Sequence, residues 1–223
     1  NMDTVIGDEL AKVIASYGGA ILFHRFTSLE TKERWMRDFP TCFMSVGLDI
    51  DANQIKFWRK EFSLTGVVID VAHGHDIRMI ELIKRLKGEV GLQVIAGNVC
   101  SATAYHDLAI AGADAIKCGV GPGSSCRTRT VTGFGYSQFS AIQECAEVAR
   151  SFKVPLIADG GINDTSDMIK ALAAGASTVM MGKLFALTSE SAAEKRNSEG
   201  LTEAKYRGQA SEDFQVQYFG KLK

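Results

Sequence analysis

Short apolar runs alternate with longer amphipathic stretches along most of this 223-residue chain. The apolar runs have the length and composition of buried strands and cover residues 20–23, 42–46, 66–71, 93–96, 115–117, 155–158 and 178–181. The longer stretches carry charges on one helical face and predict helices over about 28–38, 51–61, 76–87, 101–111, 137–151 and 164–174. Because the two kinds of segment alternate, the pattern predicts repeated βα units around a parallel sheet.

Two parallel architectures fit this pattern, a closed eight-stranded barrel and an open doubly wound sheet. The run Gly66–Val71 is apolar on both faces, as a strand covered on both sides must be. Polar or small residues stand at or just after the run ends, where barrel enzymes carry their chemistry: Asp3, His24, Gly47, Asp70, Asn98, Gly119, Asp159 and Gly182. We therefore expect an α/β fold, a (β/α)8 TIM barrel forming a single domain over residues 1–223, with its first strand ahead of Asn1 and absent from this sequence.

The last part of the chain has a different character. Residues 189–223 are charged, punctuated by glycine and poorly periodic. Two interpretations are open for this tail: a flap over the active-site face of the barrel, or a surface connection.

The composition narrows the classes of partner. A net charge of -1, with 46% hydrophobic and 23% charged residues, is ordinary for a soluble globular protein. This near-neutral charge does not indicate binding to a nucleic-acid polymer or an anionic membrane. No apolar run approaches the roughly 20 residues of a membrane-spanning helix. The cysteines, at 42, 100, 118, 126 and 145, form no Cys-x-x-Cys pair, so we expect no disulfide framework, no zinc site and a cytoplasmic location.

The loop Gly119–Arg129 contains the strongest candidate for chemistry. Its three glycines within five positions let the backbone approach a ligand or an ion closely. The same loop places Cys126 beside Arg127 and Arg129, and positive neighbours lower a thiol pKa and favour the nucleophilic thiolate. A flexible surface loop is the alternative for the glycines taken alone.

A second candidate follows the run that ends at Asp159. A carboxylate at a strand end can accept two hydrogen bonds from a ribose diol, and Gly160 and Gly161 expose backbone N–H groups to a phosphate. Gly182 ends the next run, and the last two loops of a barrel often bind phosphate. Ordinary turns are the alternative here, as a helix cap is for Asn98.

Several segments, in order along nearly the whole chain, resemble the inosine monophosphate dehydrogenase and guanosine monophosphate reductase superfamily. They are residues 1–4, 69–75, 96–99, 119–129 with 132–135, 157–162 and 205–208. The resemblance implies a (β/α)8 barrel that assembles as a homotetramer and acts on a purine mononucleotide. It also implies that Cys126 attacks C2 of the purine, and that Thr128 is similar to the threonine that works with a glutamate in the reductases.

The resemblance further implies the ligand contacts of the other positions. The carbonyls of Gly121, Gly123 and Cys126 would bind a potassium ion. Asp70, Asn98 and Lys117 would lie on the nicotinamide side. The positions implied to bind the substrate nucleotide are Ser124, Asp159, Gly160, Gly161, Gly182, Lys183, Tyr206, Gly208 and Gln209. Lys183 departs from the family pattern, which has a small residue there, and would either clash with the phosphate or pair with it as a point charge.

The direction of the reaction depends on segments outside the loop, because the same thiolate serves both enzymes. Residues 21–26 and 208–215 look more like bacterial reductases, and the arginine–tyrosine pair of the dehydrogenase flap does not occur before Lys223. These features favour NADPH-dependent reductive deamination of GMP to IMP and ammonia. The alternatives are an IMP dehydrogenase, which forms XMP with NAD, and a non-catalytic nucleotide-binding relative.

Overall fold

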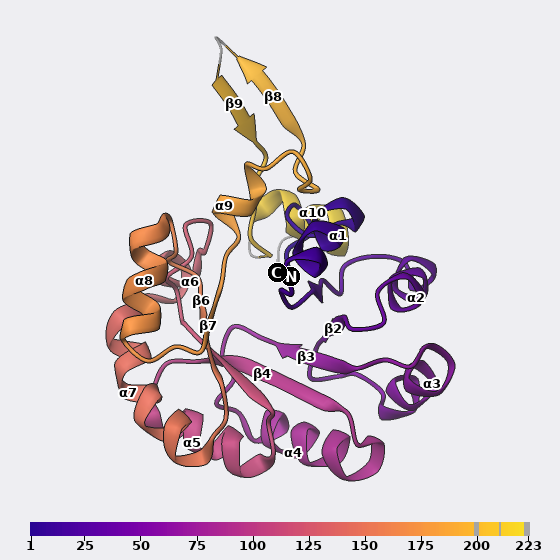
Figure 1. The fold of residues 1–223 in the computed structure, drawn as a ribbon, viewed down its shortest axis with the longest axis vertical. Helices are drawn as coiled ribbons and strands as arrows, with labels where there is room; N and C mark the ends of the chain where they lie inside the picture. Colours follow the sequence, from indigo (N-terminus) through magenta and orange to yellow (C-terminus); the bar gives the residue numbers. More distant parts are fainter. Residues whose placement is uncertain (199–200, 210, 221–223) are drawn as a thin grey trace.

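The computed structural model describes residues 1–198, 201–209 and 211–220. A curled sheet of parallel strands dominates it, with sequence neighbours paired in the order β1 to β7 (Figure 1). The strands are β1 (Leu22–Phe23), β2 (Phe43–Val46), β3 (Gly66–Asp70), β4 (Gln93–Val99), β5 (Ala115–Cys118), β6 (Leu156–Asp159) and β7 (Thr178–Met180). All seven predicted strands are therefore confirmed, and the parallel βα arrangement with them.

Helices cover the outer face of this arc of strands (Figure 1). The predicted ones are α2 (Leu29–Asp38), α3 (Ala52–Phe62), α4 (Ile77–Arg85) with the π-helical turn η1 (Leu86–Val90), α5 (Ala102–Ala111), α7 (Gln138–Phe152) and α8 (Thr165–Ala173). Their starts agree with the sequence because side-chain caps fix them: Ser28, Ser101 and Asp164 each accept a hydrogen bond from the backbone amide three residues on.

The first residues of the chain lie inside the arc, between its two ends. The Asn1 amide donates to the hydroxyl of Ser45 on β2, 2.9 Å away. A β-carbon added to Gly182, just after β7, would stand 3.1 Å from the sulfur of Met2. The described strands thus form the greater part of a (β/α)8 barrel, with the segment from Asn1 reaching from one side of the opening to the other.

Alternation along the strands divides the apolar residues into two clusters. Leu22, Val68, Ile95 and Ile157 form a small cluster on one face of the sheet. Val67 and Ile69 belong instead to the large cluster that includes residues of the surrounding helices. Successive side chains of a strand point to opposite faces. The small cluster therefore fills the barrel interior, and the next interior position is two residues further along each strand.

The tail contains structure that the sequence did not reveal. An antiparallel pair, β8 (Lys195–Ser198) and β9 (Leu201–Ala204), projects from the barrel, and α10 (Glu212–Phe219) follows it (Figure 1). The first of these strands reads Lys-Arg-Asn-Ser, which has none of the apolar alternation that marks a strand. The sequence also missed α1 (Asp8–Ser16), and the short helices α6 (Thr128–Thr132) and α9 (Lys183–Ala186).

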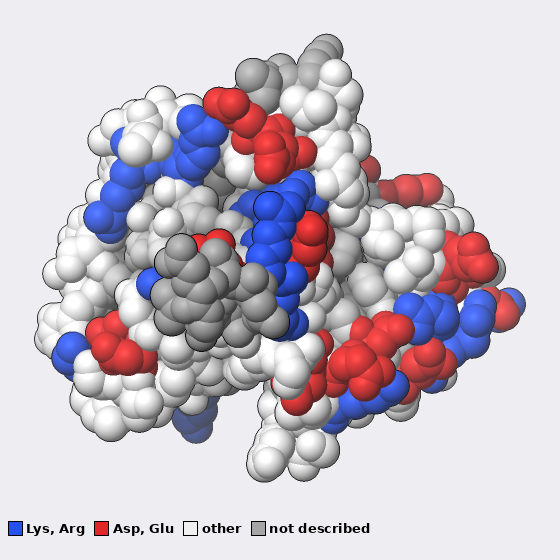
Figure 2. All heavy atoms as spheres, turned by 90° about the horizontal axis from the view of Figure 1, so that it is seen from above, with Lys and Arg blue, Asp and Glu red and all other residues white. Residues whose placement is uncertain are grey.

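Acidic and basic side chains are interspersed on the face seen from above, and neither sign dominates it (Figure 2). Among the described residues, no helix has the length and apolar character needed to cross a membrane.

Replacing Tyr105 by Phe tests the packing of α5. The Tyr105 side chain is fully buried, and its hydroxyl donates to the Val154 carbonyl at 2.9 Å. Its loss leaves that acceptor unpaired, so we expect the free energy of unfolding to fall by about 1–3 kcal/mol in denaturant titrations. Tyr17→Phe is the matched control, since Tyr17 is 88% exposed. An equal effect of both substitutions would contradict the packing described.

Candidate active site

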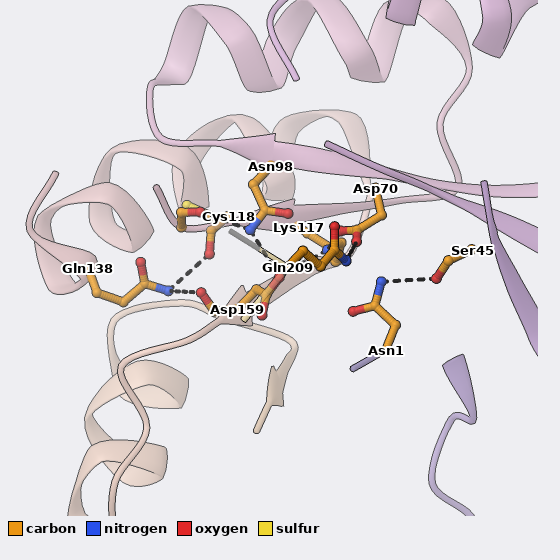
Figure 3. Close-up of polar contacts among 10 residues, drawn as sticks. Asn1, Ser45, Asp70, Asn98, Lys117, Cys118, Gln138, Asp159 and Gln209 are labelled. Carbon is orange, nitrogen blue, oxygen red and sulfur yellow. Dashed lines mark hydrogen bonds and ion pairs between the residues drawn. The ribbon is translucent and has the colours of Figure 1, made fainter. Parts of the chain in front are cut away.

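Three charged side chains occupy the interior layer just above the apolar cluster. Asp70, Lys117 and Asp159 each end or nearly end a strand, and Asp70 and Asp159 stand two positions after Val68 and Ile157. The Lys117 ammonium pairs with a carboxylate oxygen of Asp70 and with Oδ2 of Asp159, the latter at 3.0 Å (Figure 3). The Lys117 side chain is 1% exposed. One cation thus links β3, β5 and β6 inside the barrel.

Burial and charge act in opposite directions on this cluster. Burial alone would lower the pKa of Lys117, but the carboxylates of Asp159 and Asp70 outweigh it and raise that pKa. Burial would likewise raise the pKa of Asp70, and the Lys117 ammonium outweighs it, so that the pKa lies below its ordinary value. The pair is therefore ionised on both sides at neutral pH.

Asn98 on β4 extends the cluster. Its amide donates to Oδ2 of Asp159 at 2.9 Å and to the Gly119 carbonyl at 2.8 Å, while its Oδ1 is buried without a partner. The alternative of a helix cap is wrong, because Ser101 caps α5. Asn98 therefore offers a buried hydrogen-bond acceptor next to the charged layer.

Gln138, the first residue of α7, binds the main chain at the ends of β5 and β6, and the sequence did not single it out. Its side-chain amide donates to the Cys118 carbonyl at 2.9 Å and to the Asp159 carbonyl at 3.3 Å (Figure 3). In the sequence it is only a polar residue at a helix start, so no local signal distinguishes it.

Glycines let the two candidate loops approach each other closely. Gly119 and Gly160 have φ values of +147° and +87°. A β-carbon at Gly119 would overlap the Asp159 carbonyl oxygen, and one at Gly160 would lie 3.2 Å from the Gly123 nitrogen. Side chains are rarely tolerated at such φ values or in so little space. The glycines therefore serve backbone packing between the loops and do not make a free surface loop.

Cys126 is exposed at the end of the glycine-rich loop. Its thiol donates to the Thr128 hydroxyl at 3.2 Å. The arginines expected to activate it have other partners: Arg127 pairs with Glu212 of α10 at 3.5 Å, and Arg129 donates to the Tyr136 carbonyl at 2.7 Å. The structure therefore places Thr128, not a guanidinium group, in hydrogen-bonding contact with the sulfur.

A cavity of about 250 Å³ lies between the two loops and the charged layer. It brings together most of the predicted site positions: Asp70, Asn98, Gly121, Gly123, Cys126, Thr128, Asp159, Gly160, Gly182, Tyr206, Gly208 and Gln209. Four predicted positions are not part of its lining: Lys117, Ser124, Gly161 and Lys183. Lys117 is buried beneath the cavity, whereas Ser124 and Lys183 are exposed. The lining also includes positions that the sequence did not single out for a ligand, among them Met2, Ser125 and Arg127.

The tail contributes one side of this cavity. The Gln209 amide donates to Oδ2 of Asp70 at 3.3 Å, and a β-carbon at Gly208 would stand 2.9 Å from the Ser125 carbonyl oxygen. Arg207 pairs with Asp3, and their side chains are only 11% and 9% exposed. Residues 206–209 are therefore held against both the strand ends and the loop Gly119–Arg129, which we call the cysteine loop.

The donors and acceptors of the cavity suit a polar nucleotide-sized ligand. Asp70 and Asp159 line the cavity with their carboxylates as acceptors, whereas Oδ1 of Asn98 is buried as well as unpartnered and is not open to a ligand in this arrangement. The predicted potassium site stays a prediction. One of its three carbonyls, that of Gly123, accepts a hydrogen bond from the Cys126 amide at 3.0 Å.

Thiol alkylation tests the environment of Cys126. Cys42, Cys118 and Cys145 are buried, and burial raises the pKa of Cys42 to about 12. Because the thiolate is the reacting form, we expect iodoacetamide at neutral pH to modify Cys126 at least about tenfold faster than these three. Mass spectrometry of tryptic peptides gives the order, and Cys126→Ala should remove the fast phase. Earlier labelling of Cys42 would contradict the described exposure.

Comparison with known proteins places these features in a family. A family model described as the IMP dehydrogenase / GMP reductase domain matches residues 51–221. The inosine-5'-monophosphate dehydrogenase of Chlorobaculum tepidum is 51% identical over 146 residues, or 65% of this chain and 30% of that protein. The Cryptosporidium parvum protein of the same name is 43% identical over 170 residues, or 75% of this chain and 42% of that protein. The Halalkalibacterium halodurans one is 44% identical over 168 residues, or 75% of this chain and 35% of that protein.

The chain thus spans 30% to 42% of the length of these relatives. Each of them is named a dehydrogenase, so the comparisons do not support the expected preference for the reductase and fit its alternative better. The matched region contains β3 to β7, the whole cysteine loop and the tail strands. Because that region makes up most of the sequence, this chain belongs to the IMP dehydrogenase / GMP reductase family.

Proposed function

We propose that this chain forms the catalytic barrel of an oxidoreductase that oxidises inosine monophosphate at C2 of the purine with NAD, through a covalent adduct of Cys126. One observation carries the proposal: the exposed Cys126 thiol lines the same cavity as the Asp159 carboxylate and the backbone of Gly160 and Gly182. A nucleotide whose ribose binds Asp159 and whose phosphate binds the backbone of Gly160 and Gly182 presents its base to Cys126. The dehydrogenase names of the similar proteins favour this substrate.

The nucleotide-binding part of the proposal rests on backbone and carboxylate geometry. Asp159 directs Oδ2 to Lys117 and Asn98, which leaves Oδ1 to accept from ribose hydroxyls. A β-carbon at Gly182 would stand 2.5 Å from the Tyr206 hydroxyl, so the absence of a side chain there lets the tail pack closely against the end of β7. We assign the phosphate to the part of the cavity lined by Gly160, Gly182 and Tyr206.

The chemistry follows from the thiol. Addition of the Cys126 thiolate forms a C–S bond at C2 and places an electron pair on a ring nitrogen, which makes C2 tetrahedral. Loss of hydride from C2 then restores a carbon–nitrogen double bond while the sulfur stays attached. Water attacks C2, the C–S bond breaks, and the products are xanthosine monophosphate and the regenerated thiol. NAD, when bound, supplies the hydride acceptor.

Asp70 and Asn98 are the residues that we assign to the cofactor side. Both line the cavity, and the carboxylate of Asp70 is kept ionised by Lys117. Thr128 contacts the sulfur and is assigned to the handling of its proton. Gly208 and Gln209 lie where the tail meets the cavity and are assigned to the purine base.

Paired assays on the complete gene product test the proposal. We expect NAD reduction with inosine monophosphate, followed at 340 nm, and no comparable NADPH oxidation with guanosine monophosphate. Cys126→Ala should lower kcat by at least about 1,000-fold, because a sole nucleophile is removed. Cys100→Ala is the matched control, since Cys100 is not part of the cavity lining, and it should leave turnover within about twofold.

Three results would contradict the proposal. Turnover of guanosine monophosphate with NADPH, without turnover of inosine monophosphate with NAD, would establish the reductase hypothesis. Nucleotide binding in calorimetry without turnover in either direction would favour a binding protein. Full activity of Cys126→Ala would exclude the covalent mechanism.

A further inference from the structure

Lys117 is placed so that a ligand in the cavity cannot reach it. Its side chain is 1% exposed, and its ammonium already pairs with one oxygen of Asp70 and with Oδ2 of Asp159. The residue is absent from the cavity lining, whereas both of its partners belong to it. A direct contact between Lys117 and a cofactor, which the resemblance implied, does not fit this position.

Asp159 is held by two donors to its carboxylate and by one donor to its main chain. Oδ2 accepts from Lys117 at 3.0 Å and from Asn98 at 2.9 Å, and the main-chain carbonyl accepts from Gln138 at 3.3 Å. Figure 3 shows these donors converging on Asp159 from β5, β4 and α7. The two donors to Oδ2 restrict both torsions of this short side chain, and the oxygen they leave unused is Oδ1. A fixed acceptor binds a diol more tightly than a mobile one, because less conformational entropy is lost on binding.

We propose that Lys117 is a positioning residue: its buried ammonium fixes the Asp159 carboxylate so that Oδ1 accepts the ribose hydroxyls of the nucleotide, while Lys117 itself touches no ligand. The inference rests on the proposed nucleotide site but not on the direction of the reaction. It predicts that Lys117 matters for recognition of the ribose hydroxyls in particular, whereas a general structural role would weaken binding of every nucleotide alike.

The experiment compares inosine monophosphate with its 2′,3′-dideoxy analogue by calorimetry, without cofactor. The ratio of the two Kd values measures ribose recognition. Hydrogen bonds to a charged group make a ratio of roughly 10- to 100-fold reasonable for the unmodified protein. Asp159→Asn should bring the ratio close to one, since it removes the charged acceptor.

Lys117→Met alone leaves two carboxylates facing each other without a cation, which strongly destabilises a buried site. The decisive variant is therefore Lys117→Met combined with Asp70→Asn, which removes one positive and one negative charge. Asp70→Asn alone is its reference. We expect the ribose ratio of the double variant to be about tenfold lower than that of the reference. Thermal unfolding of both variants checks that they are folded.

Lys87→Met provides a matched control for loss of a lysine ion pair. Lys87 pairs with Asp114 at 2.7 Å on the surface, away from the cavity, and its loss should leave the ribose ratio unchanged. The role of Lys117 is overturned if the double variant keeps the ribose ratio of its Asp70→Asn reference while Asp159→Asn loses that ratio. The proposed nucleotide site would then still stand. A ratio that survives Asp159→Asn would overturn both, because Asp159 would then not bind the ribose.

Discussion

A lysine ammonium buried between two carboxylates is the interaction on which the site depends. Isolated, each of these ions would be costly to remove from water, and paired they keep one another charged inside the barrel. Asp70, Lys117 and Asp159 come from three neighbouring or near-neighbouring strands, so the pairing also fixes how those strand ends stand relative to each other. The positions of the polar side chains above this layer depend on these ion pairs.

The cavity is shaped as much by missing side chains as by those present. Gly119 and Gly160 bring the cysteine loop and the loop after β6 into backbone contact, and Gly182 lets Tyr206 pack closely against the end of β7. The tail then completes the cavity through Gln209, whose amide reaches Asp70, and through the buried pair of Arg207 with Asp3. Residues more than 130 positions apart in the chain therefore share one small volume.

Much of this arrangement could be predicted from the sequence, because periodicity and glycine carry strong local signals. The strands, the main helices and the gathering of Asp70, Asn98, Cys126 and Asp159 at one end of the sheet follow from them. The partners of the arginines could not be predicted, since Arg127 meets Glu212 only through tertiary packing of α10. Gln138 was missed for the same reason. The charged strand Lys195–Ser198 gives no apolar pattern to read.

The two-residue spacing between the interior apolar cluster and the charged layer has an evolutionary consequence. A slip of β5 by one position would turn Lys117 toward the helices and bring Ile116 into the charged layer. Fold and chemistry are therefore encoded by the same few strand positions. Insertions can accumulate in loops that do not line the cavity, whereas the strands can change only by substitutions that keep length and alternation.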